Sequence, residues 1–158
     1  MLELHGGGKM NRPKRVLLVD DEEGFLFSAV IALRREGYDA TGMGTPRDAI
    51  DAILEASSGK KPFDLLITDL QMPMMSGVEL VQVLRERRIP LHILTMSSVC
   101  AKGIYCTMDC SCGANHLDKP FEPRELVERV GRILGGARMK KGPTGSRPES
   151  DPGNVDLA

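Results

Sequence analysis

The sequence VLLVDDE at residues 16–22 places four apolar residues directly before three acidic ones. A short, continuous apolar run of this kind is typical of a strand in a parallel sheet that is covered on both faces. Further short runs recur at 38–41, 64–68, 91–94 and 114–117, and longer amphipathic stretches lie between them. This alternation predicts parallel strands joined by helices in right-handed crossovers, which is a doubly wound α/β fold.

Helix signals occupy the stretches between the predicted strands. Apolar residues at helical spacing predict helices at 25–33, at 78–84 and at 123–134. The segment Thr45–Asp48 supplies an N-cap threonine, a first-turn proline and an acid at the third helical position, which predicts a further helix start. The segment 97–112 has no clean apolar stripe, so the sequence gives only a weak helix signal there.

The composition indicates one domain with some spare length. The chain has 158 residues, of which 41% are hydrophobic and 27% are charged, within the ordinary range of globular domains. Residues 1–13 are Gly-rich and polar, and residues 137–158 have little apolar content, so we expect two flexible segments around a domain at 14–136. A second start at Met10 leaves open whether residues 1–9 are native.

The charge balance argues against several kinds of partner. Lys and Arg number 21 against 22 Asp and Glu, a formal net charge of -1, which does not suit a chain that coats nucleic acid or an anionic membrane. No apolar run approaches the ~20 residues that span a bilayer, and no hydrophobic signal core is present. We therefore expect a cytoplasmic protein that acts on a protein partner.

Polar residues end four of the five predicted strands. Asp20 and Asp21 follow the first strand, Asp69 the third, Thr95 the fourth and Lys119 the fifth. Each alone is an ordinary turn residue, but the carboxyl ends of parallel strands meet at one edge of the sheet. Two carboxylates ~4 Å apart repel by roughly 4 kcal/mol at an effective dielectric constant of 20, so a proton or a cation must hold them together.

These side chains suit phosphoryl chemistry. Hard oxygen ligands with open positions favour Mg²⁺, which commonly bridges carboxylates and phosphates. Lys119 offers a compact positive charge for a phosphoryl oxygen, and the Thr95 hydroxyl can donate to another. The set matches a carboxylate nucleophile that accepts a phosphoryl group.

Four motifs together resemble the receiver domain of bacterial response regulators. They are VLLVDDE at 16–22, LITDLQMPMMSG at 66–77, Thr95 after an apolar strand, and KPF at 119–121. The resemblance covers about residues 14–136. It implies a flavodoxin-like (βα)5 domain whose five-stranded parallel sheet has the order 2-1-3-4-5.

The resemblance also implies roles for individual residues. Asp69 matches the phosphoacceptor aspartate, and Asp20, Asp21, Asp69 and the backbone carbonyl of Gln71 would bind Mg²⁺. Thr95 and Lys119 match the hydroxyl and the amine that contact the phosphoryl group. The family has a cis peptide bond before the proline that corresponds to Pro120.

The partners implied are proteins. A histidine kinase or a histidine phosphotransfer protein would supply the phosphoryl group, and a downstream protein would bind the face formed by the fourth and fifth helices. The chain would be a stand-alone two-component response regulator, not an enzyme beyond its own phosphotransfer and dephosphorylation. We expect no direct nucleic-acid or membrane contact, and a homodimer stays open. A second hypothesis is an aspartate-nucleophile phosphatase, but Gln71 stands where such enzymes typically carry a second acid.

Two positions depart from the family pattern. His116 takes the place of the aromatic switch residue that works with Thr95, and an imidazole there either is a plain strand residue or makes the switch pH-sensitive. Met96 follows Thr95 where the family usually has a small residue. It either shields the aspartyl phosphate from water or folds away from it.

Four cysteines lie close together in the chain, at positions Cys100, Cys106, Cys110 and Cys112. Thiolates near His116 could bind a metal or form a redox-labile pair, which would make the chain a receiver-fold redox or metal sensor. The spacing matches no established zinc framework, and cysteine is also a common small buried residue. Both interpretations stay open from the sequence.

Overall fold

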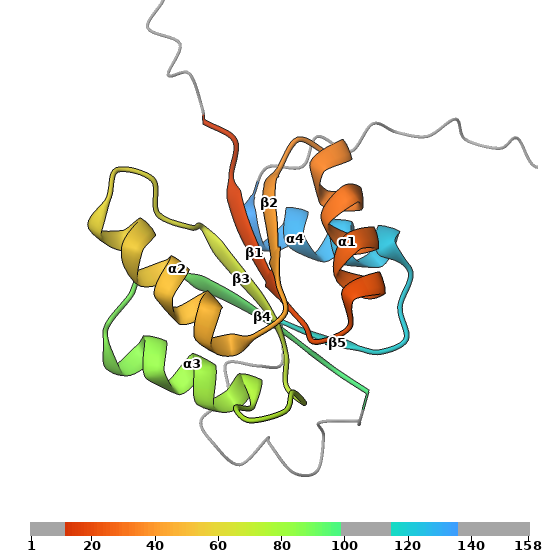
Figure 1. Ribbon diagram of the computed structural model, residues 1–158. Coiled ribbons are helices and arrows are strands. Elements are labelled where there is room, and N and C mark those ends of the chain that lie inside the picture. The colour runs from red at the N-terminus through yellow and green to blue at the C-terminus, as the bar shows by residue number, and fades with distance from the viewer. Residues whose placement is uncertain (1–11, 99–114, 136–158) are drawn as a thin grey trace, which may run out of the picture.

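The computed structural model describes residues 12–98 and 115–135. Its strands are β1 Arg15–Val19, β2 Asp39–Met43, β3 Leu65–Asp69, β4 His92–Ser97 and β5 His116–Asp118. Its helices are α1 Glu23–Arg35, α2 Pro46–Ser58, α3 Gly77–Glu86 and α4 Pro123–Leu134. All strand pairs are parallel and the order is β2-β1-β3-β4-β5, which confirms the predicted doubly wound sheet (Figure 1).

Helices cover both faces of the sheet. In Figure 1, α1 and α4 lie on one side of the strands, and α2 and α3 lie on the other. The first core cluster, on the α1 and α4 side, includes Val16, Leu18, Leu26, Leu33, Ile67, Leu94, Met96, Leu117 and Leu126. The second core cluster, on the α2 and α3 side, includes Leu17, Val19, Ile53, Phe63, Leu66, Leu80 and Leu84. Alternate residues of β1 enter opposite clusters, which explains its continuous apolar sequence.

Local signals set the helix ends, and the start at Thr45 is the one that the sequence predicted. The Thr45 side chain accepts a hydrogen bond from the Asp48 backbone N–H at 3.2 Å, and α2 begins at Pro46. Ser76 and Glu79 form a capping box at the start of α3. Gly135 ends α4 in the left-handed conformation with φ +65°.

Some predicted bounds need correction. The fourth strand was expected to end at Leu94, but β4 continues to Ser97 because its last three residues pair with β5. Thr95 therefore lies inside the strand and not after it. In α3 the fully buried positions are Leu80 and Leu84, whereas Val81 faces partly to solvent, because residues four apart share a helix face.

The structure describes some of the residues on which the remaining predictions depend, but not all of them. The peptide bond Lys119–Pro120 is cis, as the resemblance implied. Most of the segment 97–112, including all four cysteines, lies outside the described residues. Four helices lie within residues 12–98 and 115–135, and none of them is long and apolar enough to cross a membrane.

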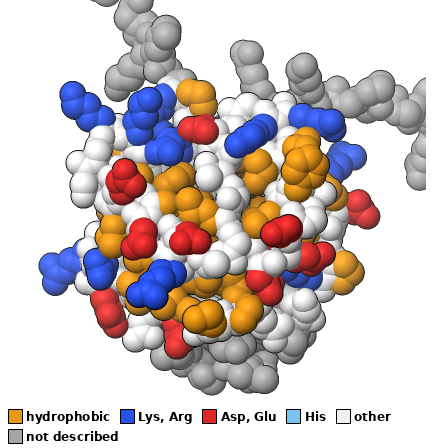
Figure 2. Space-filling view, viewed as in Figure 1, with side chains coloured by type: hydrophobic (Ala, Val, Ile, Leu, Met, Phe, Trp, Pro, Cys, Tyr) orange, Lys and Arg blue, Asp and Glu red, His pale blue; other side chains and the backbone are white. Residues whose placement is uncertain are grey.

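Surface charge is mixed on the face seen in Figure 2. Lys and Arg side chains lie along its upper edge and again at its lower left, and Asp and Glu side chains lie among and below them. The net charge of -1 therefore reflects charges of both signs that are spread over this face.

Candidate functional site

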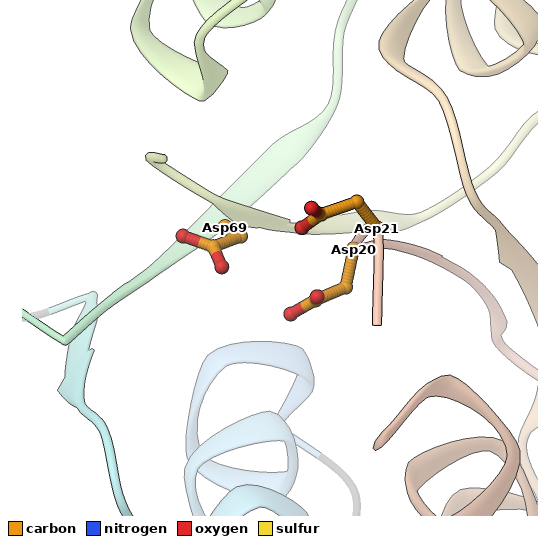
Figure 3. Close-up of side chains that lie close together, drawn as sticks. All are labelled: Asp20, Asp21 and Asp69. Atoms are coloured by element: carbon orange, nitrogen blue, oxygen red, sulfur yellow. The ribbon is translucent and has the colours of Figure 1, made fainter. Parts of the chain in front are cut away.

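Three carboxylates meet at the carboxyl ends of β1 and β3. Asp20 and Asp21 directly follow β1, and Asp69 is the last residue of β3. Because these strands are neighbours in the sheet, their ends bring the carboxyl groups together, and Figure 3 shows them converging. One ligand oxygen from each lies within 4.8 Å of the others. Asp20 and Asp69 are buried, whereas Asp21 is exposed, so the cluster opens to solvent on one side.

One lysine bridges the two buried carboxylates. Lys119 follows β5, and its Nζ donates to Asp20 Oδ2 at 2.5 Å and to Asp69 Oδ2 at 2.8 Å. Nζ also lies 4.7 Å from the centre of the Phe25 ring, a cation–π contact. Burial opposes the charge on this lysine, but its hydrogen bonds to Asp20 and Asp69 raise the pKa of Lys119 above its ordinary value. The amine is therefore held in its charged form.

The positive charge of Lys119 does not balance the negative charge of the three carboxylates. Burial raises the pKa of Asp20, although Lys119 and the backbone N–H of Glu22 act in the opposite direction. With three carboxylates facing one ammonium group, the ionised site has an excess of negative charge. Carboxylate oxygens, two buried and one exposed, form the hard donor set that Mg²⁺ accepts while keeping several waters. The described residues thus fit the predicted magnesium site.

Backbone groups fix the two buried carboxylates. The Glu22 N–H donates to Asp20 Oδ1 at 2.9 Å, and the Gln71 N–H donates to Asp69 Oδ1 at 2.8 Å. The predicted use of the Gln71 carbonyl as a metal ligand remains a prediction.

Gly77 is a site residue that our sequence analysis did not single out. A Cβ at Gly77 would overlap the backbone carbonyl of Asp69, so the start of α3 lies directly against the residue that carries the carboxylate. The signal that could have found it is the glycine that ends the LITDLQMPMMSG motif. Close approach of two backbone segments is a common reason for glycine at such a position.

Thr95 is positioned differently from the carboxylates. It pairs in register with Thr68 and His116, whereas Asp69 pairs with Met96. Side chains of adjacent strand residues alternate between faces, so Thr95 leaves the sheet on the face opposite to Asp69. Its Oγ1 lies 2.8 Å from His116 Nδ1 and 3.3 Å from the Asn115 carbonyl oxygen. The structure therefore pairs the two predicted switch residues directly.

Met96 is fully buried and belongs to the first core cluster. Its register with Asp69 places both side chains on the same face of the sheet. Shielding of an aspartyl phosphate by this side chain stays a prediction.

The fold and the site together define a class of protein. A doubly wound parallel sheet carries an acidic cluster bridged by a lysine at the carboxyl edge of its strands, where ligands of such folds bind. The model of the response regulator receiver domain family matches residues 16–131. The chain belongs to this family, the phosphoryl-accepting domains of two-component signalling.

Relatives of known name agree with this assignment. The chain is 32% identical over 121 residues to the response regulator receiver protein CpdR of Brucella abortus (strain 2308), a match that covers 77% of this chain and 97% of CpdR. It is 34% identical over 119 residues to the DNA-binding response regulator MtrA of Mycobacterium tuberculosis (strain ATCC 25618 / H37Rv). That match covers 74% of this chain and 49% of MtrA, so the chain spans about half the length of that relative.

Solved structures show the same fold. The chemotaxis response regulator CheY4 of Vibrio cholerae aligns with a TM-score of 0.67 and 26% identity, covering 77% of this chain and 99% of CheY4. The signal receiver domain of a LuxO repressor protein from Vibrio parahaemolyticus aligns with a TM-score of 0.67 and 25% identity, covering 78% of this chain and 91% of that domain.

Proposed function

We propose that this chain accepts a phosphoryl group on Asp69, in a magnesium-dependent reaction, from the phosphohistidine of a kinase or of a phosphotransfer protein. The observation that carries the proposal is the convergence of Asp20, Asp21 and Asp69 within 4.8 Å, with Lys119 bonded to two of them. The match of the receiver-domain model supports it.

The reaction forms one bond and breaks one. A carboxylate oxygen of Asp69 attacks phosphorus, the P–N bond to the donor imidazole breaks, and the imidazole nitrogen keeps the electron pair. Asp20, Asp21 and Asp69 would hold Mg²⁺, which would supply positive charge for the transferred phosphoryl oxygens. Lys119 already contacts Asp69 Oδ2 and needs only to extend its pairing to a phosphoryl oxygen.

Thr95 is the proposed hydroxyl donor to the product. In the structure its hydroxyl contacts His116 and Asn115 on the other face of the sheet. To donate its proton to a phosphoryl oxygen on Asp69, the hydroxyl must stop donating that proton to either of these acceptors, and this change of hydrogen bonding couples the site to β5. The product then signals to a downstream protein rather than to nucleic acid.

We also propose the bounds of the domain, the range of its chemistry and its location. The receiver domain occupies residues 14–136, with 1–13 and 137–158 as flexible segments outside it. Its chemistry is limited to its own phosphotransfer and dephosphorylation. It acts in the cytoplasm.

Modification by acetyl phosphate tests the proposal. The protein is incubated with acetyl phosphate with and without Mg²⁺, and the phosphorylated fraction is measured by intact-mass spectrometry. We expect Mg²⁺-dependent, single-site modification that Asp69→Asn abolishes. Asp64→Asn is the matched control, since it removes a carboxylate next to the other end of β3, and it should be modified normally.

Two results would contradict the proposal. Modification of Asp69→Asn to the wild-type extent would place the acceptor elsewhere. Release of many phosphates per protein molecule would favour the phosphatase hypothesis.

A further inference from the structure

His116 holds the Thr95 hydroxyl from the neighbouring strand. The two residues pair in register, and His116 Nδ1 lies 2.8 Å from Thr95 Oγ1. The other ring nitrogen, Nε2, is buried, has no hydrogen-bond partner of good geometry among the described residues, and lies 3.4 Å from Asp118 Oδ1. The imidazole side chain is 16% exposed and that of Asp118 is 65% exposed. One ring nitrogen, Nδ1, therefore contacts the Thr95 hydroxyl, and the other, Nε2, lies close to the Asp118 carboxylate.

The carboxylate decides which tautomer a neutral imidazole adopts. A lone pair on Nε2 facing the charge of Asp118 is repelled, so the proton of the neutral ring belongs on Nε2. Nδ1 is then an acceptor, and the Thr95 hydroxyl must donate its only proton to it. In this state Thr95 has no proton left for a phosphoryl oxygen.

A charged imidazole reverses this hydrogen bond. Both ring nitrogens then carry protons, so Nδ1–H donates to Thr95 Oγ1 and the hydroxyl proton is released. The Asn115 carbonyl competes for that proton at 3.3 Å, but a phosphoryl oxygen is a charged and therefore stronger acceptor.

We propose that His116 is a positioning residue whose protonation frees the Thr95 hydroxyl to donate to the phosphoryl group, so that phosphorylation and proton uptake by the imidazole favour each other. This inference rests on the proposed function, because it requires a phosphoryl group on Asp69.

Charged groups from several elements face this pair. Asp118 of β5 lies 3.4 Å from Nε2. Arg129 of α4 donates through Nη1 to the His116 carbonyl at 2.9 Å. A cavity of about 240 Å³ is lined by Thr95, Asn115, Arg85 of α3 and His92 of β4, among others. Arg85 and Arg129 keep their charge at all relevant pH values, so they add no titration of their own to the measurement.

The test uses beryllofluoride with Mg²⁺ as a phosphoryl mimic and measures its affinity from about pH 5 to about pH 8, where imidazoles charge. The wild-type chain is compared with His116→Phe at each pH, because the acidic cluster is common to both and cancels in the ratio. We expect the affinity ratio, wild type over variant, to rise on the order of fivefold from high to low pH, the lower end of coupling between sites. His92→Gln removes the histidine of β4 that lines the same cavity, and a ratio that follows the wild type in this variant assigns the pH dependence to His116.

A second measurement does not depend on the folding of a variant. The imidazole resonances of His116 in the wild-type chain are titrated by NMR with and without beryllofluoride, and the mimic should move the titration to higher pH. The inference is overturned, and the proposed function is not, if the affinity ratio does not change with pH. The same holds if the mimic binds without moving the His116 titration. A wild-type protein that never binds the mimic overturns the proposed function, and this inference with it.

Discussion

The two ends of β3 each carry an aspartate, and the two carboxylates have opposite surroundings. Asp64, just before the strand, accepts hydrogen bonds from the Arg15 backbone N–H at 2.8 Å and from both Nη atoms of Arg12 at 2.9 and 3.1 Å. Lys14 lies 3.7 Å away. Asp69, at the end of the strand, shares the single amine of Lys119 with Asp20.

The comparison shows what separates a structural carboxylate from a reactive one. Burial opposes ionisation of Asp64, but the Arg15 N–H and Arg12 overcome it and lower the pKa of Asp64. At the other end burial prevails and raises the pKa of Asp20. Asp64 is fully satisfied by the protein, whereas the site keeps unbalanced negative charge and therefore an affinity for a cation.

The largest effect is expected from Gly77→Ala. A Cβ there would overlap the Asp69 carbonyl, with no flexible side chain available to move, so we expect a loss of about 3 kcal/mol or more in the free energy of unfolding. Urea denaturation measures it. Gly24→Ala is the matched control: no atom lies within 4 Å of its added Cβ, and Gly24 is only the second residue of α1, so we expect a change within about 0.5 kcal/mol. Equal effects of the two substitutions would show that α3 does not constrain the Asp69 end of the strand.

Asp64→Asn should destabilise the protein by about 1–2 kcal/mol at neutral pH, since it weakens several charge-assisted hydrogen bonds, some of them partly exposed. The folded pKa of Asp64 is lowered, so its contribution is complete above the unfolded pKa and is lost as pH falls through the folded pKa. The difference from wild type should therefore shrink in acid, as urea denaturation at several pH values can measure. A difference that does not change with pH would assign the loss to packing.

Mg²⁺ should raise the melting temperature, because we expect it to bind the folded acidic cluster and not the unfolded chain. At a concentration tenfold above its Kd the stabilisation is about 1.4 kcal/mol. Differential scanning calorimetry with Mg²⁺ and with EDTA measures the shift. Asp21→Asn should reduce it and Asp64→Asn should not. An undiminished shift in Asp21→Asn would remove this exposed carboxylate from the magnesium site.

Asp20→Asn should have the smallest effect and the opposite sign to Asp64→Asn. The folded pKa of Asp20 is raised, so the folded state gains stability as pH falls and the ionised group costs stability at neutral pH. Without Mg²⁺ we expect a gain of up to about 1 kcal/mol at neutral pH, after discounting the hydrogen bond that asparagine cannot accept. The gain should shrink in acid. A loss as large as that of Asp64→Asn would contradict the contrast between the two ends.

The sequence predicts most of the site because the ionisable residues of the site stand directly at the ends of apolar strand segments. The apolar run of β1 leads directly into Asp20, and the run of β3 leads into Asp69, so the parallel sheet that the alternation predicts must also bring these carboxylates together. Lys119 could be placed for the same reason.

Contacts between distant segments of the chain could not be predicted from the sequence. The extension of β4 through Thr95 depends on pairing with β5, which lies far away in the chain. The direct bond between Thr95 and His116 follows from that register, and the overlap at Gly77 follows from how closely α3 approaches β3. None of these is encoded in a local pattern, because each depends on where a second segment lies.

β5 has three residues and is the last strand of the sheet formed by residues 12–98 and 115–135, so within these residues it has a single ladder partner. Its ends are held by the bond from the Thr95 N–H to the Asn115 carbonyl at 2.9 Å and by that from the Lys119 N–H to the Ser97 carbonyl at 2.8 Å. Short edge segments open locally far more often than whole domains unfold. Every such opening withdraws the ammonium group of Lys119 from the two buried carboxylates while β1 and β3 stay folded. The fraction of time for which Lys119 contacts both carboxylates is therefore limited by the opening equilibrium of three residues, which amide hydrogen exchange at Leu117 and Lys119 measures.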